Sequence, residues 1–468
     1  MQKFISKYGL AAHLALLAVA PLFLFPFFGS GDIAVAMLWL SAGTALWVVL
    51  EPSRRSGEML HDARSRVARE ILLDPLFWAM LSLVAMAGIR WANGGIDMAY
   101  DAEAGIWFLK EPPLAFFPGC ASGSGALPFA AAVAASVLVQ GCRHALGKSA
   151  RVLFLASSSL LASVAALVAV VCGAIGWGDA RSFMECPLST ASYPGMAFGV
   201  HFLAGIAALA GCFERKWNRY ALLYSLAIGG CATGLYFFAP TFTVLVFAAA
   251  GLLTLVYSIA YAWAACGSVD ACKCMVAVLI AMAMPVLCAM GMGSGGVNEA
   301  RLAFVGGGGF FPEAYAKLSA LLSSISLKVW QAGPWLGTGL GTFAADVRFN
   351  AAPGDWALLP YGQCAALNGW WLVLAERGLI GALAFALVAA FLLFTFVRRL
   401  AAAFGLRFYH PACFLGIAAV AAAAVDSFFS ASFLRPESLT ALAALAALAA
   451  SSFPKAKAAA AAGAGAAV

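Results

Sequence analysis

The residues best suited to chemistry in this sequence are four cations in the polar stretch 293–378. They are Arg301, Lys317, Lys328 and Arg348. Arg and Lys bind phosphate oxygens through charge-assisted hydrogen bonds, and they stabilise the negative charge that develops on a phosphate leaving group. We therefore expect these side chains to contact a phosphorylated substrate. The alternative for each of them is a solvated loop cation.

Two further residues are candidates for a general base, the group that accepts the proton of an attacking hydroxyl. His201 lies near the end of an apolar segment, where the alternative is a packed helix residue. Glu376 precedes Arg377, so a structural ion pair is the alternative for that carboxylate. We predict that one of these two side chains takes part in catalysis.

The spacing Gly337-x-Gly339-x-Gly341 superficially matches a dinucleotide-binding fingerprint. That fingerprint needs a preceding strand and a following helix in a βαβ unit, and neither fits this apolar sequence. Three glycines at this spacing also let the backbone turn sharply or approach another element closely. We predict this structural role.

The cysteines do not indicate a metal site. Most of the 12 lie in apolar runs, where a thiol behaves as a small hydrophobic group. Cys266, Cys272 and Cys274 cluster, but their spacing lacks the second ligand pair of a zinc site. Cys120 and Cys186 fall in two loops on the predicted outer side, where a disulfide between them is possible.

The composition is that of a membrane protein. Hydrophobic residues make up 63% of the 468 positions, charged residues make up 10%, and the mean hydropathy is +0.92. Long continuous apolar runs predict transmembrane helices and exclude a β-barrel, which has short alternating segments. The fold class is therefore all-α and polytopic. The net charge of +7 is spread along short loops and does not indicate a nucleic-acid partner.

Twelve apolar segments are predicted to span the membrane. They cover residues 9–28, 32–50, 73–91, 126–143, 152–176, 195–213, 220–238, 242–265, 275–292, 379–397, 411–430 and 438–453. The chain then divides into spans 1–9 (1–292), a long outer loop with a helix at Glu313–Trp330 (293–378), spans 10–12 (379–453) and an Ala/Gly-rich tail (454–468). A second outer loop, 92–125, is acidic and is predicted to be extended.

The basic residues predict the orientation. If both chain ends are cytoplasmic, 19 of the 28 Lys and Arg residues fall on the cytoplasmic side. Short cytoplasmic loops carry such an excess. Both termini are therefore predicted to be cytoplasmic, and the 293–378 loop is predicted to face outward.

Three segments carry a resemblance to a known family. They are Pro334-x-x-Gly337-x-Gly339-x-Gly341-x-Phe343, then Asn368-x-Trp370 with Leu374-Ala-Glu-Arg-Gly-Leu-Ile-Gly381, and finally Asp426-Ser-Phe-Phe followed by Pro436. The first two resemble the signature region of the O-antigen ligase and polymerase superfamily across about 315–381. The third resembles its penultimate helix. Lys317 stands where that family has an Arg, and Leu367 stands where it has a His.

The resemblance implies a glycosyltransferase C type of membrane fold. It implies transfer of a glycan from undecaprenyl pyrophosphate to an acceptor hydroxyl at the periplasmic face of the bacterial inner membrane, with no metal or other cofactor. Asn368 is then expected to contact the substrate. The alternative is a polytopic transporter or a non-catalytic relative that binds the lipid-linked glycan. Because Asp426 alone stands well inside a late span, the sequence disfavours transport.

Overall fold

The structure is a computed structural model and most of its apolar sequence is helical. It describes residues 2–28, 30–50, 52, 58–93, 95–96, 98–101, 106–109, 118–121, 126–146, 148–177, 194–214, 220–291, 313–358, 368–401 and 411–451. Each predicted apolar segment corresponds to a helix. These helices are α1 (Gln2–Leu24), α2 (Ser30–Leu50), α4 (Pro75–Ala92), α5 (Ala126–Cys142), α6 (Lys148–Ala174), α8 (Gly195–Glu214), α9 (Ala221–Phe238), α10 (Thr241–Cys266), α11 (Ser268–Gly291), α15 (Gly369–Ala401), α16 (Pro411–Asp426) and α17 (Pro436–Ser451).

Within the described residues, seven helices are long and apolar enough to cross a membrane. They lie in α2, α4, α6, α9, α10, α11 and α15. The apolar parts of α1, α5, α8, α16 and α17 are shorter. The structure therefore supports a polytopic membrane protein, whereas twelve spans and the glycosyltransferase C type of fold remain predictions.

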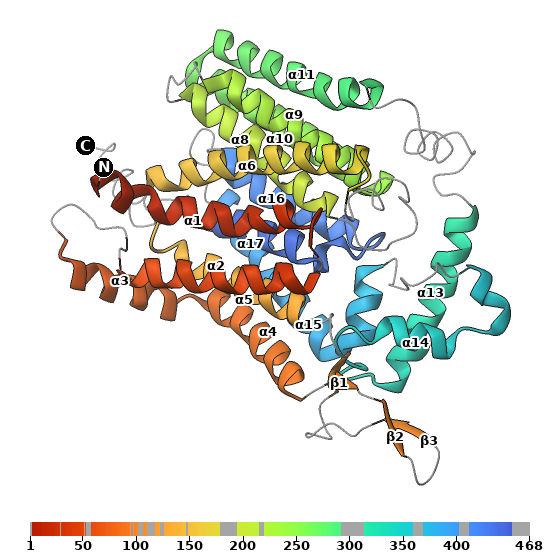
Figure 1. Cartoon of the computed structure of the whole chain (residues 1–468). Coiled ribbons are helices and arrows are strands. Elements are labelled where there is room, and N and C mark those ends of the chain that lie inside the picture. Colours follow the sequence, from red (N-terminus) through yellow and green to blue (C-terminus); the bar gives the residue numbers. More distant parts are fainter. Residues whose placement is uncertain are drawn as a thin grey trace.

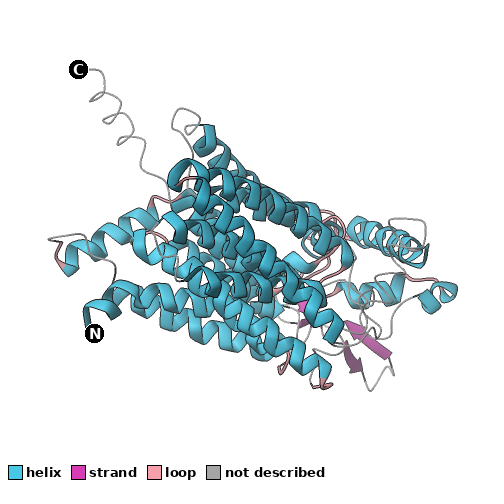
Figure 2. Ribbon diagram, turned by 90° about the horizontal axis from the view of Figure 1, so that it is seen from above, coloured by secondary structure: helices cyan, strands magenta, loops and turns pink. Residues whose placement is uncertain are grey.

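A more polar layer lies at one end of the helix bundle (Figure 1). It contains α13 (Glu313–Ala332), α14 (Phe343–Asn350), the 3-10 helix η2 (Pro353–Leu358) and four short strands. The amphipathic helix α3 (Leu60–Leu72) lies at the opposite end, and Figure 2 likewise places the strands far from the N-terminus. The predicted helix Glu313–Trp330 is confirmed as α13.

The loop 92–125, which was predicted to be extended, contains four short strands. They are β1 (Gly95–Ile96), β2 (Met98–Asp101), β3 (Ile106–Leu109) and β4 (Cys120–Ala121). β2 pairs antiparallel with β3, and β1 pairs parallel with β4. The sequences of β2 and β3 are rich in aromatic and branched residues, which favour strands. The backbone of Cys120 also forms an isolated parallel β-bridge with the backbone of Leu340, so this loop contacts the glycine-rich segment.

The main core of the bundle lies between α1, α6, α8 and α9, and it combines large apolar side chains with many alanines. Alanines on α6 and α8 are almost completely buried, and they include Ala162, Ala165, Ala166, Ala204 and Ala207. Within a membrane, small residues allow helix backbones to approach closely and gain van der Waals contact. The tight packing of this core leaves the polar layer as the part of the described structure with room for polar chemistry.

Candidate functional site

Helix α15 is broken at Gly378, which has φ 65° and ψ −169°. The break leaves carbonyl and amide groups without their helical partners. The glycine-rich segment 334–339 supplies these partners on both sides of the break. The bonds are Thr338 N to Ala375 O (2.9 Å), Gly339 N to Glu376 O (3.1 Å), Leu379 N to Pro334 O (2.9 Å) and Ile380 N to Trp335 O (3.1 Å).

The glycines of this segment take the structural role predicted from their spacing. Gly337, Gly339 and Gly341 have φ of 72°, 131° and 75°. This left-handed region is open to glycine and unfavourable for other residues. A side chain at Gly337 would collide with the backbone of Glu376 and Arg377. The glycines therefore allow a sharp turn and a close approach to α15.

Arg90 of α4 binds the same junction. Its side chain is 1% exposed, and its guanidinium donates hydrogen bonds to the carbonyls of Leu336 and Glu376 (2.7 Å for Glu376), with a longer one to Arg377 O (3.4 Å). No role was predicted for Arg90 from the sequence. The available signal was an Arg inside an apolar segment, since such residues almost always pair with carboxylates or backbone carbonyls.

Glu376 and Arg377 are both buried next to this junction. The Glu376 carboxylate accepts the backbone N–H groups of Gly341 and Phe343, so it holds the start of α14. An anion is favoured at a helix N-terminus. The predicted ion pair with Arg377 has an N–O distance of 3.9 Å. The Arg377 guanidinium lies 4.1 Å from the ring centroid of Phe129, a cation–π contact.

The third segment of the resemblance joins this region through the start of α15. Asn368 caps the helix, because its side-chain oxygen accepts from Trp370 N (2.9 Å) and Trp371 N (3.2 Å). Gly369 N donates to Ser427 O at 2.8 Å. A capping role therefore occupies the oxygen of Asn368, which we predicted to contact substrate.

Asp426 anchors the turn that receives Gly369. This fully buried carboxylate accepts hydrogen bonds from the hydroxyls of Thr243 and Ser430, the latter at 2.6 Å. The network fixes the turn between α16 and the 3-10 helix η3 (Ser432–Leu434). The residue that the sequence singled out inside a late span therefore holds backbone in place.

The structure describes the side chains of two of the four predicted phosphate-binding cations. Lys317 and Lys328 are eleven residues apart, about three helical turns, and both are exposed on α13. The apolar face of α13, with Ile325 and Val329, packs against Ala375 of α15, and the lysines lie outside this contact. Arg301 lies outside the described residues, and only the backbone of Arg348 is described, within α14. The predicted disulfide also stays untested, because Cys186 is outside the described residues.

The structure does not bring the two predicted bases together. His201 is 1% exposed and lies in the main core, where Ser159 Oγ donates to its carbonyl oxygen at 3.1 Å. Its ring faces the backbone of Ala18 in α1, but neither ring nitrogen forms a hydrogen bond of ordinary geometry there. Glu376 lies at the separate junction of α15 with α14. Their catalytic roles stay predictions.

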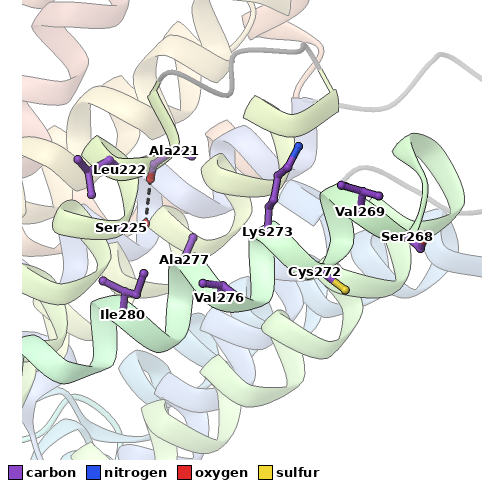
Figure 3. Close-up of a pocket in the computed structure, with 10 residues that line it drawn as sticks. All are labelled: Ala221, Leu222, Ser225, Ser268, Val269, Cys272, Lys273, Val276, Ala277 and Ile280. Atoms are coloured by element: carbon purple, nitrogen blue, oxygen red, sulfur yellow. Dashed lines mark hydrogen bonds between the residues drawn. The ribbon is translucent and has the colours of Figure 1, made fainter.

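A groove of about 570 Å³ lies between α9 and α11, away from all of these residues (Figure 3). Its lining is mostly apolar, and Ser225 donates to Ala221 O of its own helix at 2.8 Å. Lys273 at its rim pairs with Asp270 at 2.9 Å. This groove is suited to hydrocarbon and not to phosphate chemistry.

Comparison with known proteins gives no family assignment. No family model matches the chain, and no curated protein matches it. Among the described residues, no group of three or more His, Cys, Asp and Glu side chains is placed to hold a metal ion. The geometry of the junction between 334–341, 368–381 and 427–430 is therefore the main basis for a functional proposal.

Proposed function

We propose that this protein is an O-antigen-ligase-like glycosyltransferase of the bacterial inner membrane. It transfers a glycan from undecaprenyl pyrophosphate to an acceptor hydroxyl at the periplasmic face, with both chain termini in the cytoplasm. One observation supports this most strongly: the three segments that carry the resemblance, which are far apart in the sequence, meet in one hydrogen-bonded unit. Segment 334–339 bonds across the break of α15, and Gly369 bonds to Ser427.

The polar layer presents cations beside that unit. Lys317 and Lys328 share the exposed face of α13, and the buried face of α13 fixes the helix on α15 through Leu322, Ile325 and Val329. The fixed position of α13 matters because a catalytic group must be held in place to stabilise charge as it develops. Arg301 and Arg348 complete the proposed phosphate-binding set.

The reaction is a substitution at the anomeric carbon. The acceptor oxygen forms a bond to that carbon while the bond from the carbon to the pyrophosphate oxygen breaks. Undecaprenyl pyrophosphate leaves with the electron pair, and the hydroxyl proton passes to a base, for which Glu376 and His201 are the candidates. The cations stabilise the charge gained by the leaving group.

A transfer assay with matched lysine variants tests this proposal. The purified full-length protein is given undecaprenyl pyrophosphate saccharide and an acceptor, and the transferred glycan is measured. Lys317→Ala and Lys328→Ala should each lower transfer by roughly tenfold or more, because a hydrogen bond to a charged group contributes about 1.5–3 kcal/mol. Lys273→Ala, at the rim of the α9–α11 groove, should leave transfer unchanged. Flux of the saccharide across proteoliposomes without any transfer would instead establish the transporter alternative.

A further inference from the structure

A second cavity lies beside the start of α15. It has a volume of about 140 Å³ and lies between α15, α16 and α17, with contributions from α4 and α5. Alanines on three helices create the space, and they are Ala389, Ala423, Ala424, Ala443 and Ala446. α15 also packs less closely against α16 and α17 than those two helices pack against each other. The walls are almost entirely hydrocarbon.

Two buried N–H donors line this apolar cavity. Gln140 is 1% exposed, and its amide nitrogen Nε2 has no hydrogen-bond partner among the described residues. The indole nitrogen of Trp370 is buried and likewise lacks a partner in the described part of the chain. Buried donors without partners are rare in proteins, and each calls for an explanation. An acceptor oxygen from a bound molecule would satisfy one of them.

The two donors mark different ends of the cavity. Trp370 packs in one cluster with Phe433 and Leu439. Gln140 lies one turn beyond Val137, which packs in another cluster with Ala443. Along α17, the step from Leu439 to the far end at Ala446 is about 10 Å at 1.5 Å per residue. The space is therefore elongated and suits a chain.

We propose that this cavity binds a fatty acyl chain of a membrane phospholipid, whose ester carbonyl accepts a hydrogen bond from Trp370 or Gln140. A dry apolar cavity of about 150 Å³ holds a molecule the size of benzene, so this cavity takes a short stretch of the acyl chain. A polyisoprenoid chain has no acceptor along its hydrocarbon and would leave both donors unpaired. An acyl ester provides the apolar chain and the acceptor together. This site is separate from the lysine face of α13, and the proposal does not depend on glycan transfer.

Lipid binding here would act on the start of α15. Trp370 and Ser427 line the cavity and also belong to the junction that Asn368 caps. A bound chain would fill the space beneath this junction and restrict its motion. We infer that the acyl chain is a structural lipid that supports the unit formed by the three resemblance segments.

Photolabelling with a phospholipid probe tests the site. The full-length protein is placed in nanodiscs that contain phosphatidylglycerol with a diazirine in the middle of one acyl chain, irradiated, and digested for peptide mapping. Label is expected on the α17 peptide that contains Leu439–Ala446. Ala389→Phe fills the cavity and should lower this label at least fivefold. Ala390→Phe, on the exposed face of the same helix, should leave it unchanged. Equal labelling of α17 in both variants would overturn the proposal.

Separate measurements test the hydrogen bond to the ester carbonyl and the class of lipid that is bound. Native mass spectrometry measures how much phosphatidylglycerol each variant retains after detergent washing. Trp370→Phe and Gln140→Leu keep an apolar side chain in the wall but remove a donor, and at least one should lower retention severalfold. Unchanged retention in both contradicts the carbonyl bond. Loss of the photolabel on addition of a polyprenyl monophosphate, but not of unlabelled phosphatidylglycerol, would identify an isoprenoid site instead and would also refute the proposal.

Discussion

Replacing Arg90 by leucine should destabilise the junction between α4, the glycine-rich segment and α15. The guanidinium donates to Glu376 O, to Leu336 O and, more weakly, to Arg377 O. The wild-type side chain is 1% exposed, so water cannot replace it at these carbonyls. Leucine fills much of the volume but donates nothing. The variant therefore removes the guanidinium donor from the Leu336 carbonyl and leaves Glu376 O with only its bond from Gly339 N, in apolar surroundings.

The expected loss of unfolding free energy is about 3–5 kcal/mol. Hydrogen bonds to charged groups contribute about 1.5–3 kcal/mol each. Two bonds of good geometry give about the same figure. Arg90→Lys should recover part of the loss, because an ammonium provides donors but lacks the planar fork that reaches two carbonyls together.

Thermal unfolding in detergent micelles measures the effect, and limited proteolysis of segment 334–341 measures its location. Arg90→Leu should lower the Tm clearly and should expose the segment to protease. Arg69→Leu is the control, because Arg69 is exposed on α3 at the opposite end of the bundle. If Arg90→Leu unfolds at the wild-type Tm and segment 334–341 stays protected from protease, the hydrogen bonds of Arg90 do not hold the junction together.

Three other substitutions test neighbouring features. Gly378→Ala should lower the free energy of unfolding by about 1–3 kcal/mol because of the positive φ alone, and by more because the new side chain collides with the backbone of Trp335. Gly354→Ala is the control: its side chain would meet open space, and the Tm in the same thermal assay should not change. Glu376→Gln should weaken the start of α14 and lower Tm and glycan transfer together; a loss of transfer with unchanged Tm would instead indicate a base. Burial alone would raise the pKa of Asp74, but His144 at 3.2 Å and Arg143 at 2.6 Å outweigh it, so the pKa of this carboxyl is lowered. Its stabilising contribution is therefore full above the unfolded pKa of about 3.9 and is lost as the pH falls through the folded value. Asp74→Asn should lower Tm at pH 7 and the gap to wild type should shrink below about pH 4; a gap that stays constant with pH would refute this assignment.

The sequence predicted the helices well because they depend on local hydrocarbon content. Each apolar segment became a helix, and so did the segment predicted as a helix at Glu313–Trp330. The glycine conformations were also predictable, since Gly337 and its neighbours match no nucleotide-binding context. In these cases the residue types and their spacing are sufficient to predict the local structure.

Features that depend on distant partners were not predictable. Arg90 binds carbonyls that are 246–287 positions away in the chain, and no local pattern indicates this. Asn368 was expected to contact substrate, but its cap became evident only with the start of α15. His201 was weighed as a base because it lies near a helix end, whereas helix packing buries it in the core. Tertiary contacts decide such roles.

The broken helix has a consequence for how the chain is made. A span with unpaired backbone groups is unfavourable in lipid until something satisfies them. Both partners of the break, Arg90 and segment 334–341, precede Gly378 in the sequence. They have therefore left the ribosome before the break emerges. The insertion machinery can then release this span into lipid with the backbone groups of the break already hydrogen-bonded.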